Sequence, residues 1–588
     1  MGKEVNRIRI NRLYSENNIF DPILFHDGIN IILGEKYDDN SIEGRKTNGV
    51  GKSLCIEFLD FCMLKDYKSS RIEKIPEKVC PLNEKIMLNL DIGDDEITII
   101  RCRAEADSPI ILKNHSHVSF NKIQDARNYL TELIYSKLDA KQVPSYRNLF
   151  SILMRDERSE FTDIIKCYDL RKRLPDDFSA HLFLLGLSVD LYRTTMDTVK
   201  QMDAITTVIK KNKSELTDNG NKKMSDVKAQ MNALDDEIKK LKNAVESFKT
   251  NEAFDSMETE IIELENSLDE LRARQKALRH DYEKIKSMPK PEQIDDHEIE
   301  LVYNQFKSEL GSAIVKSLND VVGFKNKVEN FQRMILNQKA KELEKQLNDI
   351  ANQIRILDEE YSEKLKLIDE KGVLKNLKTS LKIYEAKKDS VSHTKYLFDE
   401  YEKNDKKKRQ LKLQKTQQIV DIDNDKENNK QIIDDFKDTI LEIHEAIMGN
   451  KECSFDIQTI DKSNSKSPIK FNLRIYDDGS HSVDRTKVFI YDVALLFNKY
   501  TRERHPLFLV HDNIFDVDQD TLVQCLNYLY KQEEQYQDFQ YILTLNRDKI
   551  ENEERRKVID MDITAHQVAV FTKEKKFLKK DYQELEKQ

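Results

Sequence analysis

Apolar and polar residues alternate differently at the ends of the chain and in its middle. Short apolar runs at residues 28–34 (GINIILG) and 85–92 (KIMLNLDI) lie near a helical pattern at 52–64, and similar runs return at 505–512 and 539–548. Short apolar runs between turn residues are typical of strands, and an apolar residue every three or four positions is typical of helices. Both ends are therefore predicted to be α/β. Four further strands are expected at residues 7–15, 96–104, 453–461 and 470–479.

The middle of the chain, from about residue 196 to 448, carries a heptad pattern instead. Alternating spacings of four and three keep apolar side chains on one seam of a helix that pairs with another. One seam runs through Leu234, Ile238, Leu241, Val245 and Phe248, resumes after a skip at Met257, Ile261, Leu264, Leu268 and Leu271, and continues through Leu278, Tyr282 and Ile285. A second runs through Leu343, Leu347, Ile350, Ile354, Leu357 and Tyr361. These seams predict a long antiparallel coiled coil.

The tip of this coil is expected somewhere in residues 286–325. Pro289 and Pro291 favour a break at the start of this range because proline ends a helix, whereas the midpoint of the segment is nearer Gly323. Three segments are thus predicted: α/β halves at 1–195 and 449–588, joined by a helical arm at 196–448. Two unrelated globular domains joined by a structural coil are the alternative.

Composition agrees with long solvated helices, since 35% of the 588 residues are charged and only 14 are glycine. The net charge of −10 does not exclude DNA, because local basic clusters can still bind phosphates. Seven cysteines without a CxxC pair fit a reducing cytosol, and no apolar stretch is long enough to span a membrane, so a cytoplasmic protein is expected. No cysteine lies between Cys167 and Cys453, so no zinc site built from cysteine thiolates is expected in the arm.

The most specific motif follows the apolar run 29–34 and opens a predicted helix. Glycines between a strand and a helix let backbone amides wrap phosphates. Lys52 is expected to reach the β- and γ-phosphates of ATP, and Ser53 to bind Mg²⁺. Lys46 stands where the usual pattern has its first glycine, so Gly34, before an insertion at 35–47, is the better candidate. The predicted phosphate loop comprises Asn48, Gly49, Val50, Gly51, Lys52 and Ser53.

A second motif, PLFLVHDNIFDVDQD, reads as a buried strand that delivers a carboxylate to Mg²⁺. Asp512 is the first candidate for this ligand. Counting from Asp518 instead aligns His511 with the magnesium ligand and Asp512 with the catalytic base, and both registers stay open. Asn513 could orient the attacking water but could not accept its proton. An acidic turn after a core strand is the structural alternative.

The order of phosphate loop, long coil and FLVHDNIFD resembles the SMC and double-strand-break-repair ATPase superfamily. More narrowly, KVFIYDVALL, FLVHDNIFDVDQD and QYILTLNRD are similar to bacterial SMC-like ABC ATPases of Lamassu and ABC-three-component defence systems. The resemblance implies an α/β ABC-type P-loop ATPase head, assembled from both chain ends and interrupted by the antiparallel coiled coil. It also implies that two heads sandwich two ATP molecules.

The resemblance carries several further residues with it. The signature loop falls at DGSHSVDRT, where Gly479, Ser480 and Ser482 are available to the opposing γ-phosphate. Asp156 is carried over weakly from the glutamine loop as a metal ligand, and Asn546 replaces the switch histidine. These departures from the family pattern point to slow or conditional hydrolysis.

Basic clusters are expected near both roots of the arm, where duplex DNA could bind through its phosphates without sequence reading. Solvated helix faces are the alternative. The clusters are Lys210, Lys211, Lys213, Lys222 and Lys223, and Lys406, Lys407, Lys408, Arg409, Lys412 and Lys415. A basic run at 573–580 is expected to solvate a terminal helix.

The leading hypothesis is an ATPase subunit that dimerises through its heads, senses double-stranded DNA and controls separate effector and accessory subunits, such as a nuclease, in anti-phage or anti-plasmid defence. ATP and Mg²⁺ are its expected cofactors. The alternatives are a repair or chromosome-organising ATPase and a coiled-coil scaffold that does not hydrolyse ATP.

Overall fold

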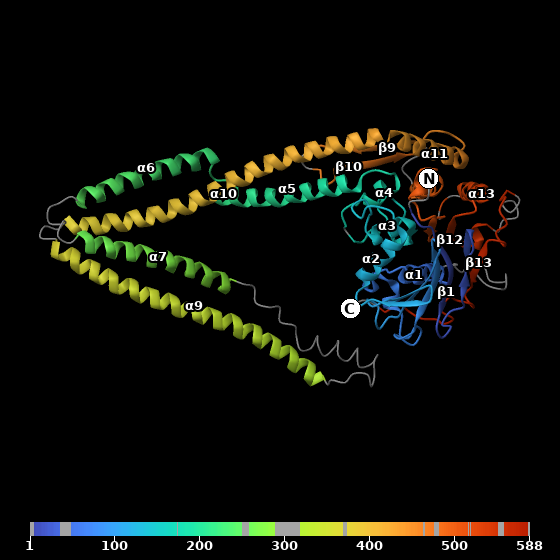
Figure 1. Cartoon of the computed structure of the whole chain (residues 1–588), viewed down its shortest axis with the longest axis horizontal. Coiled ribbons are helices and arrows are strands. Elements are labelled where there is room, and N and C mark those ends of the chain that lie inside the picture. The colour runs from blue at the N-terminus through green and yellow to red at the C-terminus, as the bar shows by residue number, and fades with distance from the viewer. Residues whose placement is uncertain are drawn as a thin grey trace. The chain divides into compact units, whose positions relative to one another are not determined.

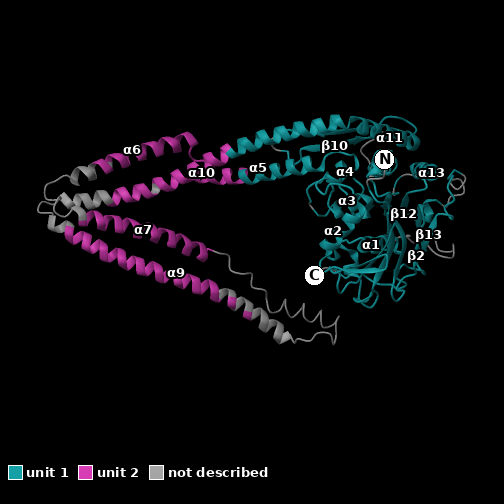
Figure 2. Ribbon diagram, viewed as in Figure 1, with its two compact units in different colours: residues 1–205, 407–588 teal, residues 206–406 magenta. Residues whose placement is uncertain are grey.

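A computed structural model of the chain describes most of its residues. These are 5–35, 49–172, 174–249, 258–287, 318–368, 373–462, 465–475, 481–515, 517, 519–550 and 558–585. The chain divides into two compact units, residues 1–205 with 407–588 and residues 206–406 (Figure 2). We call them the head and the arm.

The head is organised around a five-stranded parallel sheet in the order β13-β3-β12-β11-β8. Its central strands are apolar almost throughout, because a parallel sheet is covered on both faces. Strands from both ends of the chain share this sheet, and β12 pairs with β3 on one side and with β11 on the other. Figure 1 shows blue strands of the N-terminal end and red strands of the C-terminal end together in the head. Neither end could form this sheet alone. The strands are β3 (Gly28–Gly34), β8 (Met154–Arg155), β11 (Phe508–His511), β12 (Gln540–Asn546) and β13 (Gln567–Phe571).

A six-stranded antiparallel sheet comes from the N-terminal part of the head. Helix α1 (Lys52–Cys62) contacts both this sheet and β3, which explains why nearly all its residues are buried. Gln540 joins the two sheets, since its side chain exchanges hydrogen bonds of 2.8 Å with the backbone of Ile10. The antiparallel strands are β1 (Ile8–Ser15), β2 (Ile23–Leu24), β4 (Ile86–Ile92), β5 (Asp95–Arg101), β6 (Ile110–Lys113) and β7 (Ser116–Ser119).

Strands are present wherever the sequence predicts them, including a two-stranded sheet of β9 (Ser454–Thr459) and β10 (Ile469–Arg474). Helices complete the head: α2 (Ile123–Ile134), α3 (Tyr146–Leu153), α4 (Ser179–Leu184), α11 (Lys430–Met448), α12 (His481–Phe497) and α13 (Gln519–Gln535). Short 3-10 turns are η1 (Tyr67–Ser69), η2 (Arg71–Lys74), η3 (Glu157–Ser159), η5 (Thr501–Glu503) and η6 (Arg547–Lys549).

The described residues of the arm are mostly helical, with a turn at residues 217–223. Ile261 and Leu268 of the first seam and Leu343 and Ile350 of the second are buried. The helices are α6 (Met224–Lys249), α7 (Glu258–Lys286) and α9 (Leu318–Ile368), with α5 (Val189–Leu216) and α10 (Val373–Asn428) shared with the head. None of the described helices is long and apolar enough to cross a membrane.

The arm helices do not follow one simple hairpin. Lys228 and Glu237 of α6 pair with Glu402 and Lys387 of α10, so these helices are antiparallel. Salt bridges of 2.6 and 3.1 Å join Arg272 and Lys276 of α7 to Glu385 and Asp389 of α10, so α7 and α10 are parallel. Therefore α6 and α7 run in opposite directions.

This arrangement corrects the prediction of one continuous seam from Leu234 to Ile285. Heptad spacing is the same for one long helix and for two helices that reverse direction, so the pattern could not separate these cases. Helix α7 pairs with α9 in the antiparallel sense, through Arg272 with Asp358 and Glu260 with Lys364. Most of the range expected for the tip, residues 288–317, lies outside the described residues.

Candidate functional site

The predicted phosphate loop is described from Gly49 onward, and Asn48 lies outside the described residues. Gly51 precedes α1 with a φ of 110°, in the left-handed region that favours glycine. A side chain at this position would also meet the Phe577 Cβ at 2.6 Å. The loop therefore requires glycine at 51 for both its backbone conformation and its close neighbour.

Lys52 lies buried across the end of β3. A Cβ added to Gly34 would come within 2.8 Å of the Lys52 Nζ, so the absence of a side chain at Gly34 makes room for the lysine. The Nζ donates a hydrogen bond of 2.5 Å to the Asn546 Oδ1 at the end of β12. Burial lowers the pKa of Lys52, and the nearby Asp512 and Glu157 oppose that shift.

Asp512 follows β11 directly and faces the first turn of α1. Its Oδ1 accepts hydrogen bonds from the Ser53 hydroxyl at 3.1 Å and from the Thr544 hydroxyl at 2.8 Å. Parallel strands end at the same edge of the sheet, and β3, β11 and β12 bring Lys52, Asp512 and Asn546 together there. Residues far apart in the sequence therefore form one polar cluster.

Burial raises the pKa of Asp512 to about 7, and the negative charge of Glu157 adds to this shift. The hydrogen bonds from Thr544 and Ser53 act in the opposite direction. Burial disfavours the charged form of the Asp512 carboxylate. A bound divalent ion would compensate for the lost solvation and so favour that charged form.

His511 does not face this cluster. Its imidazole is fully buried, with Nε2 3.0 Å from the Asp492 Oδ2 and Nδ1 2.9 Å from the Tyr541 hydroxyl. Successive residues of a strand point to opposite faces, so His511 and Asp512 cannot both reach the phosphate loop. The geometry contradicts the register that made His511 a magnesium ligand and Asp512 the base. Asp518 lies outside the described residues.

The same buried network contains Arg155, whose Nε lies 2.6 Å from the Asp492 Oδ2. Both side chains have no exposed surface. Arg155 ends β8, Asp492 belongs to α12, and His511 ends β11. The network therefore links three elements that approach the site, a connection that nothing in the sequence pattern indicated.

Asn513 lines the cavity beside the phosphate loop with a φ of 62°. Its backbone N–H donates to the Thr544 hydroxyl at 2.8 Å, and its carbonyl accepts from Arg485 at 2.7 Å. The position next to Asp512 is thus fixed in space but offers an amide rather than a carboxylate.

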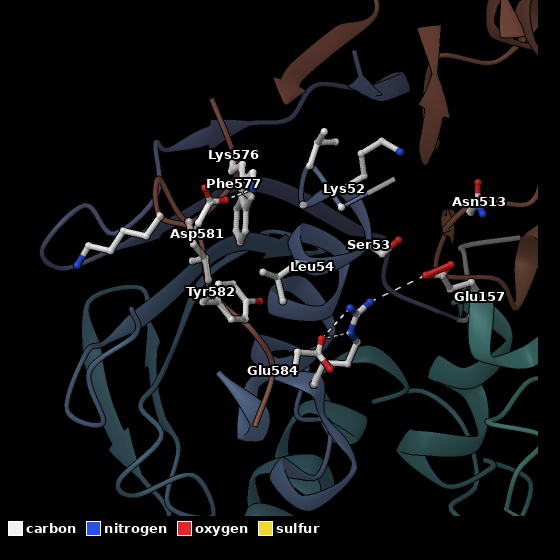
Figure 3. Close-up of a pocket in the computed structure, with 16 residues that line it drawn as sticks. Lys52, Ser53, Leu54, Glu157, Asn513, Lys576, Phe577, Asp581, Tyr582 and Glu584 are labelled. Atoms are coloured by element: carbon white, nitrogen blue, oxygen red, sulfur yellow. Dashed lines mark hydrogen bonds and ion pairs between the residues drawn. The ribbon is translucent and has the colours of Figure 1, made fainter. Parts of the chain in front are cut away.

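Glu157 was not among the site residues predicted from the sequence. It lies in the turn after β8 and lines the same cavity as Ser53 and Asn513 (Figure 3). The weakly predicted Asp156 instead caps this turn, accepting from the Arg158 N–H at 3.0 Å, and lies 3.3 Å from the Lys65 Nζ. Both acids follow β8 in the sequence, and the structure places Glu157 rather than Asp156 in the lining of the cavity.

The cavity between these residues has a volume of about 470 Å³. Figure 3 shows Glu157 and Asn513 at one end, Leu54 in the middle, and Tyr582 and Asp581 at the other end. The last two belong to residues 572–585, which were expected to include a solvated terminal helix. They contain no helix. Residues 573–580 instead form bends and a turn beside Val50, whose carbonyl accepts a hydrogen bond from the Phe577 N–H, and the Phe577 ring is buried there.

The predicted signature region lies partly outside the described residues. Gly479 and Ser480 lie outside the described residues, and Ser482 is placed only as a backbone position near the start of α12. Their contact with a second head stays a prediction.

The predicted DNA-binding residues lie mostly on the surface: Lys210, Lys211 and Lys213 are exposed on α5, while on α10 Lys406, Lys407 and Arg409 are exposed and Lys408 is half-buried. Lys415 is different, because it is buried and its Nζ donates to the Lys462 carbonyl at 2.9 Å. Its inclusion in the basic cluster was wrong.

Within the described residues, no group of three or more histidine, cysteine, aspartate or glutamate side chains is arranged to hold a metal ion. Mg²⁺ in nucleotide sites is commonly bound by one or two protein oxygens together with substrate phosphates. Ser53 and Asp512 provide two such oxygens.

A family model matches part of the chain, and solved structures match most of its length. Residues 443–581 match the model of a family described as an uncharacterised protein conserved in bacteria, DUF2326. No curated protein matches. The Smc head domain with a coiled coil and joint from Pyrococcus yayanosii is 12% identical, with 94% of each chain covered and a TM-score of 0.33. The Smc head domain with an extended coiled coil bound to the C-terminal domain of ScpA, from Pyrococcus furiosus, is 10% identical, covering 94% of this chain and 92% of that chain with a TM-score of 0.33. At these values the likeness carries no functional argument.

Proposed function

We propose that the head binds ATP with Mg²⁺ and hydrolyses it. The observation that carries this proposal is the meeting of Lys52, Ser53 and Asp512 at one edge of the parallel sheet, beside a cavity of about 470 Å³. Glycines before α1 leave backbone N–H groups for phosphates, and the start of the helix adds its positive end. Lys52 would move from Asn546 to the β- and γ-phosphates.

Ser53 and Asp512 would hold Mg²⁺, which neutralises phosphate charge when it is bound. In hydrolysis, a water oxygen bonds to the γ-phosphorus, the bond to the bridging oxygen of ADP breaks, and the water gives up a proton. Asn513 can orient that water but cannot take its proton. Glu157, at the same end of the cavity, is the carboxylate available to accept it.

Nucleotide binding and hydrolysis by Lys52→Ala, Asp512→Ala and wild type test this function. Loss of a charged interaction with phosphate should raise the Kd for ATP at least about tenfold in Lys52→Ala. Asp512→Ala should abolish the Mg²⁺ dependence of binding and hydrolysis. Lys85→Ala removes an exposed lysine that does not line the cavity, and it serves as the matched control. Three indistinguishable proteins would refute the proposal.

The wider role follows as a proposal of SMC type. Two heads would close around two ATP molecules, double-stranded DNA would bind the exposed basic residues, and the arm would transmit closure to separate effector and accessory subunits. Exposure of Lys210, Lys211, Lys406 and Lys407 supports the DNA part, because cations on solvated helices can release counterions from DNA. Anti-phage or anti-plasmid defence is the proposed setting, and DNA repair is the alternative.

A charge-reversal variant tests the DNA part. Replacing Lys406, Lys407, Lys408 and Arg409 by glutamate should weaken duplex binding regardless of sequence. The plot of log K against log salt should become shallower by about 0.9 for each phosphate that the variant no longer neutralises. Reversal of the exposed Lys339, Lys341 and Lys345 on α9 is the control. An unchanged slope would move DNA binding elsewhere.

Asn513 favours one further candidate, a scaffold that binds ATP without hydrolysing it, because the residue after Asp512 carries no carboxylate. Tight ATP binding with no turnover, in the presence of DNA and partner subunits, would support the scaffold over the ATPase.

A further inference from the structure

The last described segment, residues 572–585, is anchored firmly to the nucleotide site, and we call it the C-terminal strap. Phe577 is 2% exposed and packs in an aromatic cluster, with ring centroids 4.6 Å from Phe20, 5.2 Å from Phe58 and 5.5 Å from Phe571. Its backbone N–H donates to the carbonyl of Val50, inside the phosphate loop, at 3.2 Å. The strap therefore holds the phosphate loop from one side.

Further contacts fix the strap beyond Phe577. The Arg71 Nε and Nη2 both donate to the Glu584 Oε1, at 2.9 and 2.7 Å. The Lys580 Nζ donates to the Lys78 carbonyl at 2.9 Å, and the Leu585 N–H donates to the Lys74 carbonyl at 2.8 Å. The strap is thus a structural wall of the cavity and not a loose end.

The two ends of the cavity have different chemistry. Lys52, Ser53, Asn513 and Glu157 mark the end where the γ-phosphate would lie. An ATP molecule whose phosphates occupy the loop must place its nucleoside toward the other end, past Leu54. Figure 3 shows that this end is formed by the strap, with the ring of Tyr582 facing into the cavity close to Leu54.

Tyr582 is the aromatic side chain suited to a base at this end. It is half-buried and lines the cavity, whereas the ring of Phe577 is already packed against Phe20. Among the described residues, no other aromatic ring stacks against Tyr582. Charges flank it on the strap, since Lys576 pairs with Asp581 and Glu584 pairs with Arg71. A flat apolar face between hydrogen-bonding groups is what a nucleoside requires.

We propose that the C-terminal strap is the nucleoside-binding wall of this site, with Tyr582 stacking on the base of a nucleoside triphosphate. This inference rests on the proposed ATP binding and deepens it. Every base has a π-face, so the stacking selects for a nucleotide over a bare polyphosphate rather than for one base over another. Because the strap also holds Val50, base and phosphate recognition meet in one segment.

The chain contains no tryptophan, which provides a direct probe. In Tyr582→Trp the new indole is the sole tryptophan, and its emission should change when MgATP is added. Inorganic tripolyphosphate with Mg²⁺, which has phosphates but no base, should leave that emission nearly unchanged. The same emission in Gln583→Trp, an exposed neighbour on the strap that does not line the cavity, should respond to neither.

Affinities complete the test. By calorimetry, Tyr582→Ala should raise the Kd for ATP about tenfold, Tyr582→Phe should restore it, and neither should change the Kd for tripolyphosphate. Lys52→Ala should weaken both ligands. An unchanged ATP affinity in Tyr582→Ala, or equal losses for ATP and tripolyphosphate, would overturn the nucleoside wall while leaving the phosphate loop in place. Wild type that binds no nucleotide would overturn the proposed function and this inference together.

Discussion

The head and the arm both use many charged residues, but they use them differently. In the head, Arg155 and Asp492 form an ion pair in which neither side chain is exposed. In the arm, Arg272 pairs with Asp358 while their side chains remain 36% and 47% exposed. Loss of one partner leaves an uncompensated buried charge in the head, whereas water replaces the partner in the arm.

The two ion pairs show that the arm and the head are specified in different ways. The arm is specified by a repeated local pattern, and each of its many exposed ion pairs contributes little to stability. The head depends on a few contacts between residues hundreds of positions apart, such as Lys52 with Asn546 and Ser53 with Asp512. Single substitutions should therefore act locally and weakly in the arm, and strongly in the head.

The largest expected effect comes from removing the acid of each pair. Asp492→Ala should destabilise the head by about 3 to 5 kcal/mol, because Arg155 keeps only the carbonyls of Asp163 and Ile164 as partners. Asp358→Ala should cost about 0 to 1 kcal/mol. Differential scanning calorimetry of the full chain checks this, with each variant compared with wild type in the same buffer. Equal shifts in both variants would remove the contrast between the two units.

A second prediction concerns a head acid that is not locked in the core. The Glu157 side chain is 43% exposed, and its Oε1 lies 3.9 Å from the Arg71 Nη1. If it accepts the proton of the attacking water, Glu157→Gln should lower kcat at least about a hundredfold with little change in the Kd for ATP. The neighbouring exposed Glu160→Gln is the matched control. Wild-type turnover by Glu157→Gln would exclude it as the base.

The third and smallest effect is a pH dependence of the buried Asp512. The pKa of Asp512, about 7, lies above its ordinary value of about 3.9, so the folded head holds this proton more tightly than the unfolded chain does. The resulting stabilisation of the empty head is therefore fully present below about pH 3.9 and is lost as the pH rises toward 7. Mg²⁺ needs the ionised form, so its affinity in the ATP complex should rise about tenfold between roughly pH 6 and 8.

Asp512→Asn provides the comparison for this pH profile, since it keeps the shape of the side chain but cannot ionise. Titrations of Mg²⁺ at fixed ATP should show a shallower profile in the variant, with the remaining slope due to ATP itself. Parallel profiles in both proteins would show that Asp512 does not titrate in this range.

The turn of the predicted phosphate loop could be placed from the sequence, because its glycines, lysine and serine are neighbouring residues, and its binding of phosphates stays a proposal. Gly51, Lys52 and Ser53 stand between a strand and a helix, and each is described where the pattern expects it. The sequence left two registers open for Asp512. The structure turns the His511 side chain away from Ser53 and places Asp512 beside it, which favours Asp512 as the proposed Mg²⁺ ligand.

Other parts could not be predicted because they depend on distant contacts. Glu157 reaches the cavity only because β8 lies beside β11, a pairing of residues 154–155 with 510–511. The basic run at 573–580 resembles a solvated helix in sequence, yet Phe577 within it buries its ring among Phe20, Phe58 and Phe571. The opposite directions of α6 and α7 are likewise invisible to heptad spacing.

Neighbouring residues were enough to predict the strands, the glycine-containing turn before α1 and the apolar heptads of the arm, because periodicity and spacing are local properties of the chain. The folded chain was needed to show which strands are adjacent, which acid lies beside Ser53, and which residues cover the end of the cavity beyond Leu54. Those features rest on the burial of apolar groups and the pairing of polar ones across the whole length of the chain, and no local pattern encodes them.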